Sequence, residues 1–329
     1  MDKLLEINNL KVEYKTDIET VYAVNGISFS LEKGKTLGLV GETGAGKSTT
    51  ALTIMRLLPE KTGKITSGSV VFDGTNILDT SEETMRSIRG EEIAMIFQDP
   101  MTSLNPVQTV GEQVFEALRF HNRENKSLKE LEERVDEVFL MVGIDPKRKN
   151  EYPHQFSGGM KQRVVIAMAL VCEPRLLISD EPTTALDVTI QAQVLAMMEE
   201  LKKKFNMSMI MITHDLGIVA KTCDDVAVMY AGEIVEYGSV EEIFSQGQHH
   251  PYTEGLFGSI PKLNDTSMRL KPIDGMMLDP TLEVKGCRFA SRCPYHKEIC
   301  DSTHPDAVNI DGRHTICCHL YKKGGMRNE

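Results

Sequence analysis

The sequence has no long hydrophobic run. Its longest uninterrupted apolar stretch, Val164–Cys172, is nine residues, whereas a membrane-spanning helix needs about 20. The first residues (MDKLLEINN) carry acidic side chains where a secretory signal needs a positive segment followed by an apolar one. We therefore expect the chain to stay in the cytosol and to meet any membrane only through partner proteins.

An excess of positive charge is also missing. The chain has 37 Lys and Arg against 48 Asp and Glu, a formal net charge of −11. Sequence-independent binding of nucleic acid depends on Lys and Arg at phosphates, so nucleic acid is not an expected partner. With 329 residues, of which 41% are hydrophobic and 26% charged, the composition is typical of a globular protein of about two domains.

The cysteines lack the usual spacing of a structural zinc site. Five of the seven lie in the last 43 residues: Cys287, Cys293, Cys300, Cys317 and Cys318. In a reducing cytosol such a group favours a metal over disulfides. Cys287, Cys293, Cys300 and Cys318 are separated by five, six and seventeen residues, and none of these gaps is the two to four residues typical of zinc pairs. Histidines lie among them, so a mixed Cys/His zinc site is an open alternative: His296, His304, His314 and His319.

Short apolar runs alternate with helical patterns from Met1 to about Gly238. The expected strands are Leu4–Tyr14, Tyr22–Leu31, Thr36–Val40, Val70–Phe72, Ile93–Phe97, Leu176–Ser179, Met207–Thr213, Val226–Tyr230 and Glu233–Tyr237. The expected helices are Ser48–Leu58, Val110–Arg119, Leu128–Val142, a segment after Gln155, and Ile190–Phe205. This alternation predicts an α/β sheet with a helical insertion of roughly 50–60 residues. Beyond Ser245 the pattern loosens, so we place a boundary there.

A glycine-rich segment between an expected strand and an expected helix matches the phosphate-binding pattern G-x-x-x-x-G-K-[ST]. It reads Gly41-Glu42-Thr43-Gly44-Ala45-Gly46-Lys47-Ser48-Thr49. Glycines let the backbone curl so that successive N–H groups point at phosphate oxygens, and the helix N-terminus adds partial positive charge. Lys47 can reach the β- and γ-phosphates, and the Ser48 hydroxyl can complete a Mg²⁺ shell. ATP and Mg²⁺ are therefore the expected ligands.

Two more motifs suit the same chemistry. Leu176–Glu181 is an apolar strand that ends in two carboxylates, at the sheet edge where α/β proteins bind ligands. Asp180 would hold Mg²⁺, and Glu181 could accept a proton from the water that attacks the γ-phosphate. A second anion-binding element is the helix start Ser157-Gly158-Gly159. One chain does not need two γ-phosphate sites, so this element is expected to serve a nucleotide held by another subunit.

In this order, the motifs resemble the ATP-binding subunit of ABC transporters. The resemblance covers residues 1 to about 240, from the phosphate motif through Gln98, SGGMKQR and SDEPTTALD to His214. Three later segments resemble the oligopeptide/dipeptide importer branch and its nickel-importing relatives: Gln98–Pro106, His250–Thr253 and Gly286–Pro294. The family's signature, Phe156–Met160 in this chain, departs from the general pattern at Met160, where most ABC proteins have Gln, so its side chain offers no amide.

The resemblance implies a fold, a division into domains and roles for further residues. The fold is α/β: a P-loop NTPase (RecA-like) core with an antiparallel β subdomain, a helical signature subdomain and a small Cys-rich C-terminal domain. The nucleotide-binding domain would span residues 1–245, with the helical subdomain at about 100–165, and the C-terminal domain residues 246–329. Tyr14 would stack on adenine, with Tyr22 a weaker candidate. Gln98 would contact Mg²⁺ and the attacking water, and Asp187 would lie at the dimer seam. His214 would contact the γ-phosphate.

The resemblance also implies partners and a cofactor. The chain would be the ATPase subunit of an importer of di- or oligopeptides, peripheral on the cytoplasmic side of the membrane. Its partners would be a second, related ATPase subunit, two transmembrane permease subunits and an extracellular substrate-binding protein. Some family members carry a [4Fe–4S] cluster on the C-terminal cysteines, and the closing motif places Cys318 rather than Cys317 in the fourth ligand position. The alternatives are a nickel or small-solute cargo, or an ABC ATPase of DNA repair or translation.

Overall fold

A computed structural model gives the structure of the chain over residues 2–122, 125–184, 186–259 and 272–321. The chain forms two units, each built from separate stretches of sequence. The first unit comprises Met1–Leu4, Leu31–Thr36 and Asn76–Ile212; the second comprises Leu5–Ser30, Leu37–Thr75 and Thr213–Glu329. The glycine-rich phosphate motif lies in the second unit, and the SGG and SDE motifs lie in the first.

Three parallel strands form the sheet of the first unit: β6 (Ile93–Ile96), β7 (Leu176–Asp180) and β8 (Ser208–Ile212). Every residue of β7 and β8 is buried, as is usual for parallel strands covered on both faces. Helix α6 (Gly158–Leu170) leads into β7, and α7 (Val188–Lys204) connects β7 to β8. The predicted α/β alternation is confirmed here.

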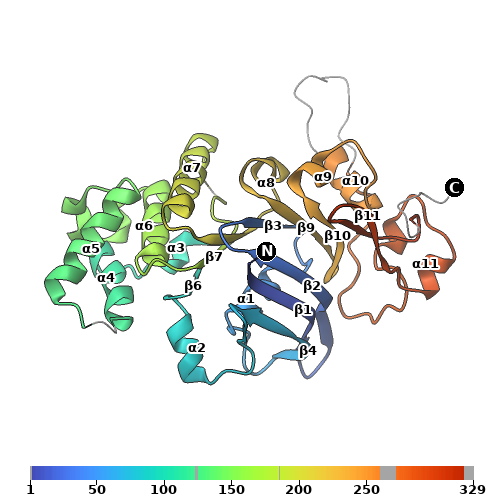
Figure 1. The fold of residues 1–329 in the computed structure, drawn as a ribbon, viewed down its shortest axis with the longest axis horizontal. Coiled ribbons are helices and arrows are strands. Elements are labelled where there is room, and N and C mark those ends of the chain that lie inside the picture. The colour runs from blue at the N-terminus through green and yellow to red at the C-terminus, as the bar shows by residue number, and fades with distance from the viewer. Residues whose placement is uncertain (1, 123–124, 185, 260–271, 322–329) are drawn as a thin grey trace. The chain divides into compact units, whose positions relative to one another are not determined.

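A helical segment separates β6 from β7. Its two longest members before α6 are α4 (Val110–Phe120) and α5 (Leu128–Met141), within a residue of the predicted bounds. Each begins with a capping box, Thr109 with Glu112 and Ser127 with Glu130, which satisfies N–H groups that a helix start leaves unpaired. Figure 1 shows α4, α5 and α6 grouped together. The unit also contains α2 (Glu82–Ile88), α3 (Pro100–Ser103), η1 (Pro146–Asn150) and η2 (Pro153–Gln155).

The second unit contains two sheet regions. In one, the strand order is β2-β1-β4-β5, and β1 pairs antiparallel with β4. In the other, β3 pairs parallel with β9; β9 with β10, β10 with β12 and β12 with β11 are antiparallel. The strands are β1 (Lys3–Lys15), β2 (Thr20–Glu32), β3 (Thr36–Val40), β4 (Gly63–Phe72), β5 (Thr75–Asn76), β9 (Asp225–Tyr230), β10 (Glu233–Ser239), β11 (Ala307–Asp311) and β12 (His314–Cys317).

The C-terminal segment shares the core of the phosphate-motif strand. Val40 at the end of β3, Tyr230 of β9 and two residues from the C-terminal part, Tyr252 and Phe289, belong to one buried cluster. The helices of this unit are α1 (Lys47–Ile54), α8 (Leu216–Thr222), α9 (Val240–Phe244), α10 (Pro251–Gly258), η3 (Ala290–Arg292) and α11 (Ile299–Ser302). Among the described residues, no helix is both long enough and apolar enough to cross a bilayer.

Two predicted boundaries were wrong. Helix α1 ends at Ile54, not Leu58, because Arg56 adopts a left-handed backbone (φ 50°) that breaks the helix before Pro59 is reached. Strand β4 begins at Gly63, seven residues before the predicted Val70; its first half is polar and only intermittently covered, so the apolar pattern marks only its end.

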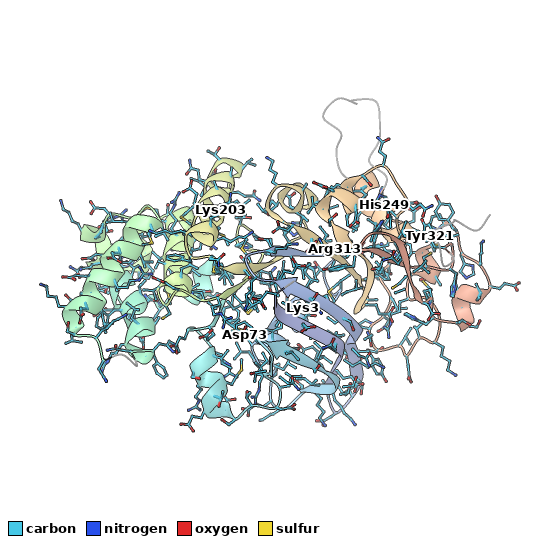
Figure 2. The ribbon with its side chains drawn as sticks, viewed as in Figure 1. Lys3, Asp73, Lys203, His249, Arg313 and Tyr321 are labelled. Atoms are coloured by element: carbon cyan, nitrogen blue, oxygen red, sulfur yellow. The ribbon has the colours of Figure 1, made fainter. Side chains whose placement is uncertain are left out.

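A buried polar cluster joins β10, β12 and the loop before α10 in the second unit. Glu236 of β10 uses one carboxylate oxygen to accept hydrogen bonds from His249 Nδ1 and from His314 Nε2 of β12, both 2.8 Å long. The other ring nitrogen of His249 lies 2.9 Å from the Ser245 carbonyl. Figure 2 labels His249 and Tyr321, which lie close together because the Tyr321 hydroxyl donates to the His249 carbonyl (2.7 Å).

This cluster fixes a buried charge. Both ring nitrogens of His249 face acceptors, so the imidazolium form satisfies both. Burial alone would lower the pKa of His249, but the hydrogen bonds to Glu236 and Ser245 raise it above the ordinary 6.5. Burial alone would raise the pKa of Glu236, but the hydrogen bonds from His249 and His314 lower it to about 2.

We expect the stability of the protein to fall as pH rises through the raised pKa of His249. A histidine stabilised in its charged form contributes fully below its unfolded pKa, about 6.5, and loses that contribution above its folded one. His249→Gln should lower the free energy of unfolding at pH 6 by about 2 kcal/mol. It should also reduce the decrease in stability that the wild-type protein shows as the pH rises to 9. Thermal unfolding from pH 6 to 9 measures both. The exposed His154→Gln is the control and should show the wild-type dependence of stability on pH. If His249→Gln loses as much stability between pH 6 and 9 as the wild type does, His249 is not the group responsible.

Candidate nucleotide-binding site

The phosphate loop (Gly41–Lys47) leaves the end of β3 through a tight backbone path. A Cβ at position 41 would overlap the Met229 carbonyl oxygen of the neighbouring strand β9, so only glycine fits there. Gly46 has φ 100°, in the left-handed region that favours glycine. The loop then enters α1, whose N-terminus follows Gly46.

The side chain of Lys47 is buried and folds back onto the backbone of the loop. Lys47 Nζ donates to the carbonyl oxygens of Gly41 (2.7 Å) and Glu42 (2.9 Å). Ser48 is exposed, and Thr49 accepts a hydrogen bond from the Tyr14 hydroxyl (3.3 Å). The second unit thus brings the predicted adenine-stacking Tyr14 to the helix that begins at the phosphate loop; Tyr22 instead pairs through its backbone N–H with Pro280 (2.8 Å).

The carboxylate motif of the first unit forms a polar group at the end of β7. Asp180 is buried, 5% exposed. Glu181 Oε2 accepts from Gln98 Nε2 and from the Thr184 hydroxyl, each at 3.0 Å. Glu181 also adopts a left-handed backbone (φ 49°), a conformation that non-glycine residues rarely hold outside turns and functional sites. The structure therefore brings Gln98 and Glu181 together, although they lie 83 positions apart in the sequence.

The signature element caps α6. The Ser157 hydroxyl accepts from the Met160 N–H (3.4 Å), while Ser157 and Gly158 remain exposed. A Cβ at Gly159 would lie 2.5 Å from Ile190 Cγ2, so this glycine permits the close approach of α7. Asp187 caps α7 by accepting from the Ile190 N–H (2.9 Å), and Ala185 of the same motif lies outside the described residues.

His214 lies in the second unit, just after Thr213 and before α8. Its side chain is exposed. The next residue, Asp215, caps α8 by accepting from the N–H groups of Gly217 and Ile218. This cap fixes the turn that carries His214, and it accounts for the acidic residue beside the histidine.

Four cysteines line one pocket, which we call the cysteine pocket: Cys287, Cys293, Cys300 and Cys318. Cys317 is not among its lining residues. Burial raises the pKa of Cys287 to about 12, with a further contribution from the other three thiols. A Cβ at position 286 would overlap the Cys300 carbonyl oxygen, which explains the glycine before Cys287.

Several residues that support these sites were missed by sequence reasoning. Arg292 forms an ion pair with Glu42 of the phosphate loop, and the Tyr252 hydroxyl accepts a hydrogen bond from the Glu42 N–H. The signal for Tyr252 was present in the His250–Thr253 motif, but nothing in the sequence says that it contacts residue 42.

Within the described residues, one group of three side chains of the metal-binding types has its ligand atoms within 4.8 Å of one another: Glu236, His249 and His314. The 2.8 Å distances from Glu236 to the two histidines are the hydrogen bonds described above.

Comparison with known proteins supports the sequence resemblance. The ABC transporter family model matches residues 24–184, and the model of the oligopeptide/dipeptide transporter C-terminal region matches residues 235–300. The dipeptide transport ATP-binding protein DppD of Bacillus subtilis is 51% identical over 97% of this chain and 95% of its own length. The oligopeptide transport ATP-binding protein OppD of Salmonella typhimurium is 48% identical, covering 95% and 93%. The chain belongs to this family of peptide ABC transporter ATP-binding subunits.

Solved structures of ABC cassettes share its fold. The protein cbiO1 of Clostridium perfringens, part of the ABC transporter complex cbiONQ, has a TM-score of 0.64 and 32% identity, covering 75% of this chain and 92% of its own. The ATP-binding cassette MJ0796, in a dimeric post-hydrolysis state with ADP and Pi, has a TM-score of 0.65 and 28% identity, covering 72% and 98%. The predicted α/β P-loop fold of the ABC ATPase family is therefore confirmed.

Proposed function

We propose that this ABC subunit hydrolyses ATP to energise the import of di- or oligopeptides. The observation that carries this is the match over nearly the full chain to peptide-transport ATP-binding proteins, including the region specific to that branch. The chain would sit on the cytoplasmic side of the membrane, bound to two permease subunits, and a substrate-binding protein outside would deliver the peptide. A second, related ATPase subunit would complete the dimer.

The nucleotide roles follow the geometry of each motif. Gly41, Thr43, Gly44, Ala45, Gly46, Lys47, Ser48 and Thr49 would bind the phosphates. Lys47 already faces two carbonyl oxygens, so a phosphate would replace these partners without leaving the ammonium unpaired. Ser48, Gln98 and Asp180 offer hydroxyl, amide and carboxylate oxygens, the ligand types that Mg²⁺ prefers, and the ion would neutralise phosphate charge. Tyr14 would contact adenine and His214 the γ-phosphate.

Glu181 is the proposed general base. Its carboxylate accepts hydrogen bonds from Gln98 and Thr184, and these two contacts orient it for proton transfer. Proton transfer by a positioned carboxylate contributes about 100-fold or more to such a rate.

Glu181→Gln should retain ATP binding but lower turnover about 100-fold or more, because an amide cannot take the proton of the attacking water. The isosteric amide can still accept from Gln98, so the site keeps its shape. ATPase activity and ATP affinity are measured in the intact transporter. Lys47→Ala is the contrasting variant, since it should weaken ATP binding itself. Near-normal turnover in Glu181→Gln would rule out the assignment.

Ser157, Gly158 and Gly159 are proposed to close over the nucleotide of the opposing subunit. The exposed N-terminus of α6 supports this role, because its N–H groups and hydroxyl suit a phosphate.

Ser157→Arg should abolish ATP-driven closure and hydrolysis in the transporter, because a bulky cation would obstruct that face. ATP binding to its own phosphate loop should stay at the wild-type level, measured by equilibrium binding to the isolated subunit. Ser127→Arg is the matched control, since Ser127 caps α5 in the same way. ATP-dependent association that persists in Ser157→Arg, followed by light scattering, would defeat the proposal.

We propose a [4Fe–4S] cluster in the cysteine pocket. Four thiols on one pocket are the usual ligand set. When bound, the cluster would supply binding free energy that holds the surrounding loops.

Anaerobically purified protein should be brown, with a broad absorption near about 400 nm. Replacing any of Cys287, Cys293, Cys300 or Cys318 by Ser should remove or weaken the colour. Cys317→Ser is the control beside the fourth ligand and should keep it. Colourless protein with stoichiometric zinc by elemental analysis would overturn the cluster and leave the ATPase assignment intact.

A further inference from the structure

The second residue of the phosphate loop is held from several directions. The Glu42 carboxylate receives Arg292 Nη1 (2.8 Å) and Nη2 (3.1 Å), a two-pronged ion pair. The Glu42 N–H donates to the Tyr252 hydroxyl (2.9 Å). Its carbonyl accepts from Lys47 Nζ (2.9 Å). The side chain, the amide and the carbonyl of one loop residue are therefore all engaged, two of them by the C-terminal segment.

Arg292 is itself fixed in place. Its side chain is 5% exposed. Nε donates to the Asp274 carbonyl (3.0 Å) and Nη2 to the Ile273 carbonyl (3.3 Å). The guanidinium lies over the rings of Tyr230 and Phe289, 5.7 and 6.0 Å from their centroids. Planar, multidentate contacts of this kind suit Arg and cannot be reproduced by Lys.

Tyr252 is equally constrained. It is fully buried, and its ring packs against Tyr230 and Phe289 at centroid distances of 4.8 and 5.5 Å. Its N–H donates to His250 Nδ1 (3.1 Å), and His250 lines the cysteine pocket. The hydroxyl that meets the phosphate loop thus belongs to a buried ring that packs against two other rings.

Arg292 also belongs to the segment that connects two cysteines of the pocket. It ends η3, and Cys293 follows it directly. The Ala290 N–H donates to the Cys287 carbonyl (3.0 Å) and the Cys293 N–H to the Ala290 carbonyl (3.2 Å). Four residues separate Arg292 from Cys287, so the positions of Cys287 and Cys293 constrain the backbone that carries Arg292.

We propose that Arg292 is a positioning residue for ATP binding. It holds the phosphate loop in its curled form through Glu42, with Tyr252 as a second support, and connects the loop to the cysteine pocket. Arg292 touches no reacting atom, so its effect is on affinity for ATP and not on the chemical step. The inference rests on the proposed ATPase function.

The test is a double-mutant cycle on Arg292 and Glu42 in the intact transporter. Arg292→Gln and Glu42→Gln should each raise the KM for ATP roughly tenfold, because each breaks a two-pronged charged pair whose arginine is buried. The kcat at saturating ATP should stay within about twofold, since the reacting groups are elsewhere. The double variant should be no worse than either single one. Arg292→Lys should recover only part of the affinity.

Arg288→Gln is the matched control. Arg288 lies in the same segment, is 7% exposed and pairs with Glu233 (3.0 Å) instead of the phosphate loop. It should leave the KM for ATP unchanged even if stability falls. If Arg292→Gln does not fold, the partly exposed Glu42→Gln breaks the same pair from the other side and must still raise KM. Additive effects, or an equal rise in Arg288→Gln, would overturn the inference; a wild-type transporter without ATPase activity would instead refute the proposed function.

Discussion

The phosphate loop can follow β3 only because its first residue lies directly against the neighbouring strand. The Met229 carbonyl of β9 leaves no space for any side chain at position 41, so the backbone of the loop packs directly against β9. Strand β9 therefore positions the start of the phosphate loop. The same strand continues into Tyr230, whose ring packs against Tyr252 and Phe289, so the loop and the C-terminal segment are built on one support.

Two charged side chains of the phosphate loop, Lys47 and Glu42, already have hydrogen-bonding partners before any nucleotide binds. Lys47 is paired with backbone carbonyls, and Glu42 with Arg292. Burying an unpaired charge costs far more than exchanging one partner for another. In the proposed mode of binding, an arriving phosphate would replace the weak dipolar partners of Lys47 with a full negative charge, while the Glu42–Arg292 pair would keep the backbone in the same curl. Such binding would be favoured because the loop does not have to be organised at that moment.

Groups of residues were predictable where residue types follow a recognisable pattern along the chain: the phosphate loop after β3, the Asp180-Glu181 pair at the end of β7, and the four cysteines that line one pocket. The chemistry of these groups stays a prediction. Arg292 and Tyr252 could not be predicted in this way, because an arginine before a cysteine and a tyrosine after a proline have no local reason to meet Glu42. The Glu236 cluster was missed for the same reason. The sequence indicates His314 as a possible metal ligand, whereas the pairing of β10 with β12 places it in a hydrogen bond with Glu236. Helix α1 shows a further limit, since a left-handed backbone at Arg56 ends it at Ile54, before the predicted Leu58.

The Glu42–Arg292 pair joins residues 250 positions apart, and this separation has a consequence for how the protein is made. During synthesis the N-terminal strands and the loop leave the ribosome long before Arg292 exists, because chains grow at about 5–20 residues per second. The nascent loop therefore spends many seconds without its C-terminal support. Contacts between such distant residues form late, since a long intervening chain must first be closed. If Arg292 supports the phosphate loop as proposed, the subunit would reach its full nucleotide affinity only after most of the chain has been synthesised.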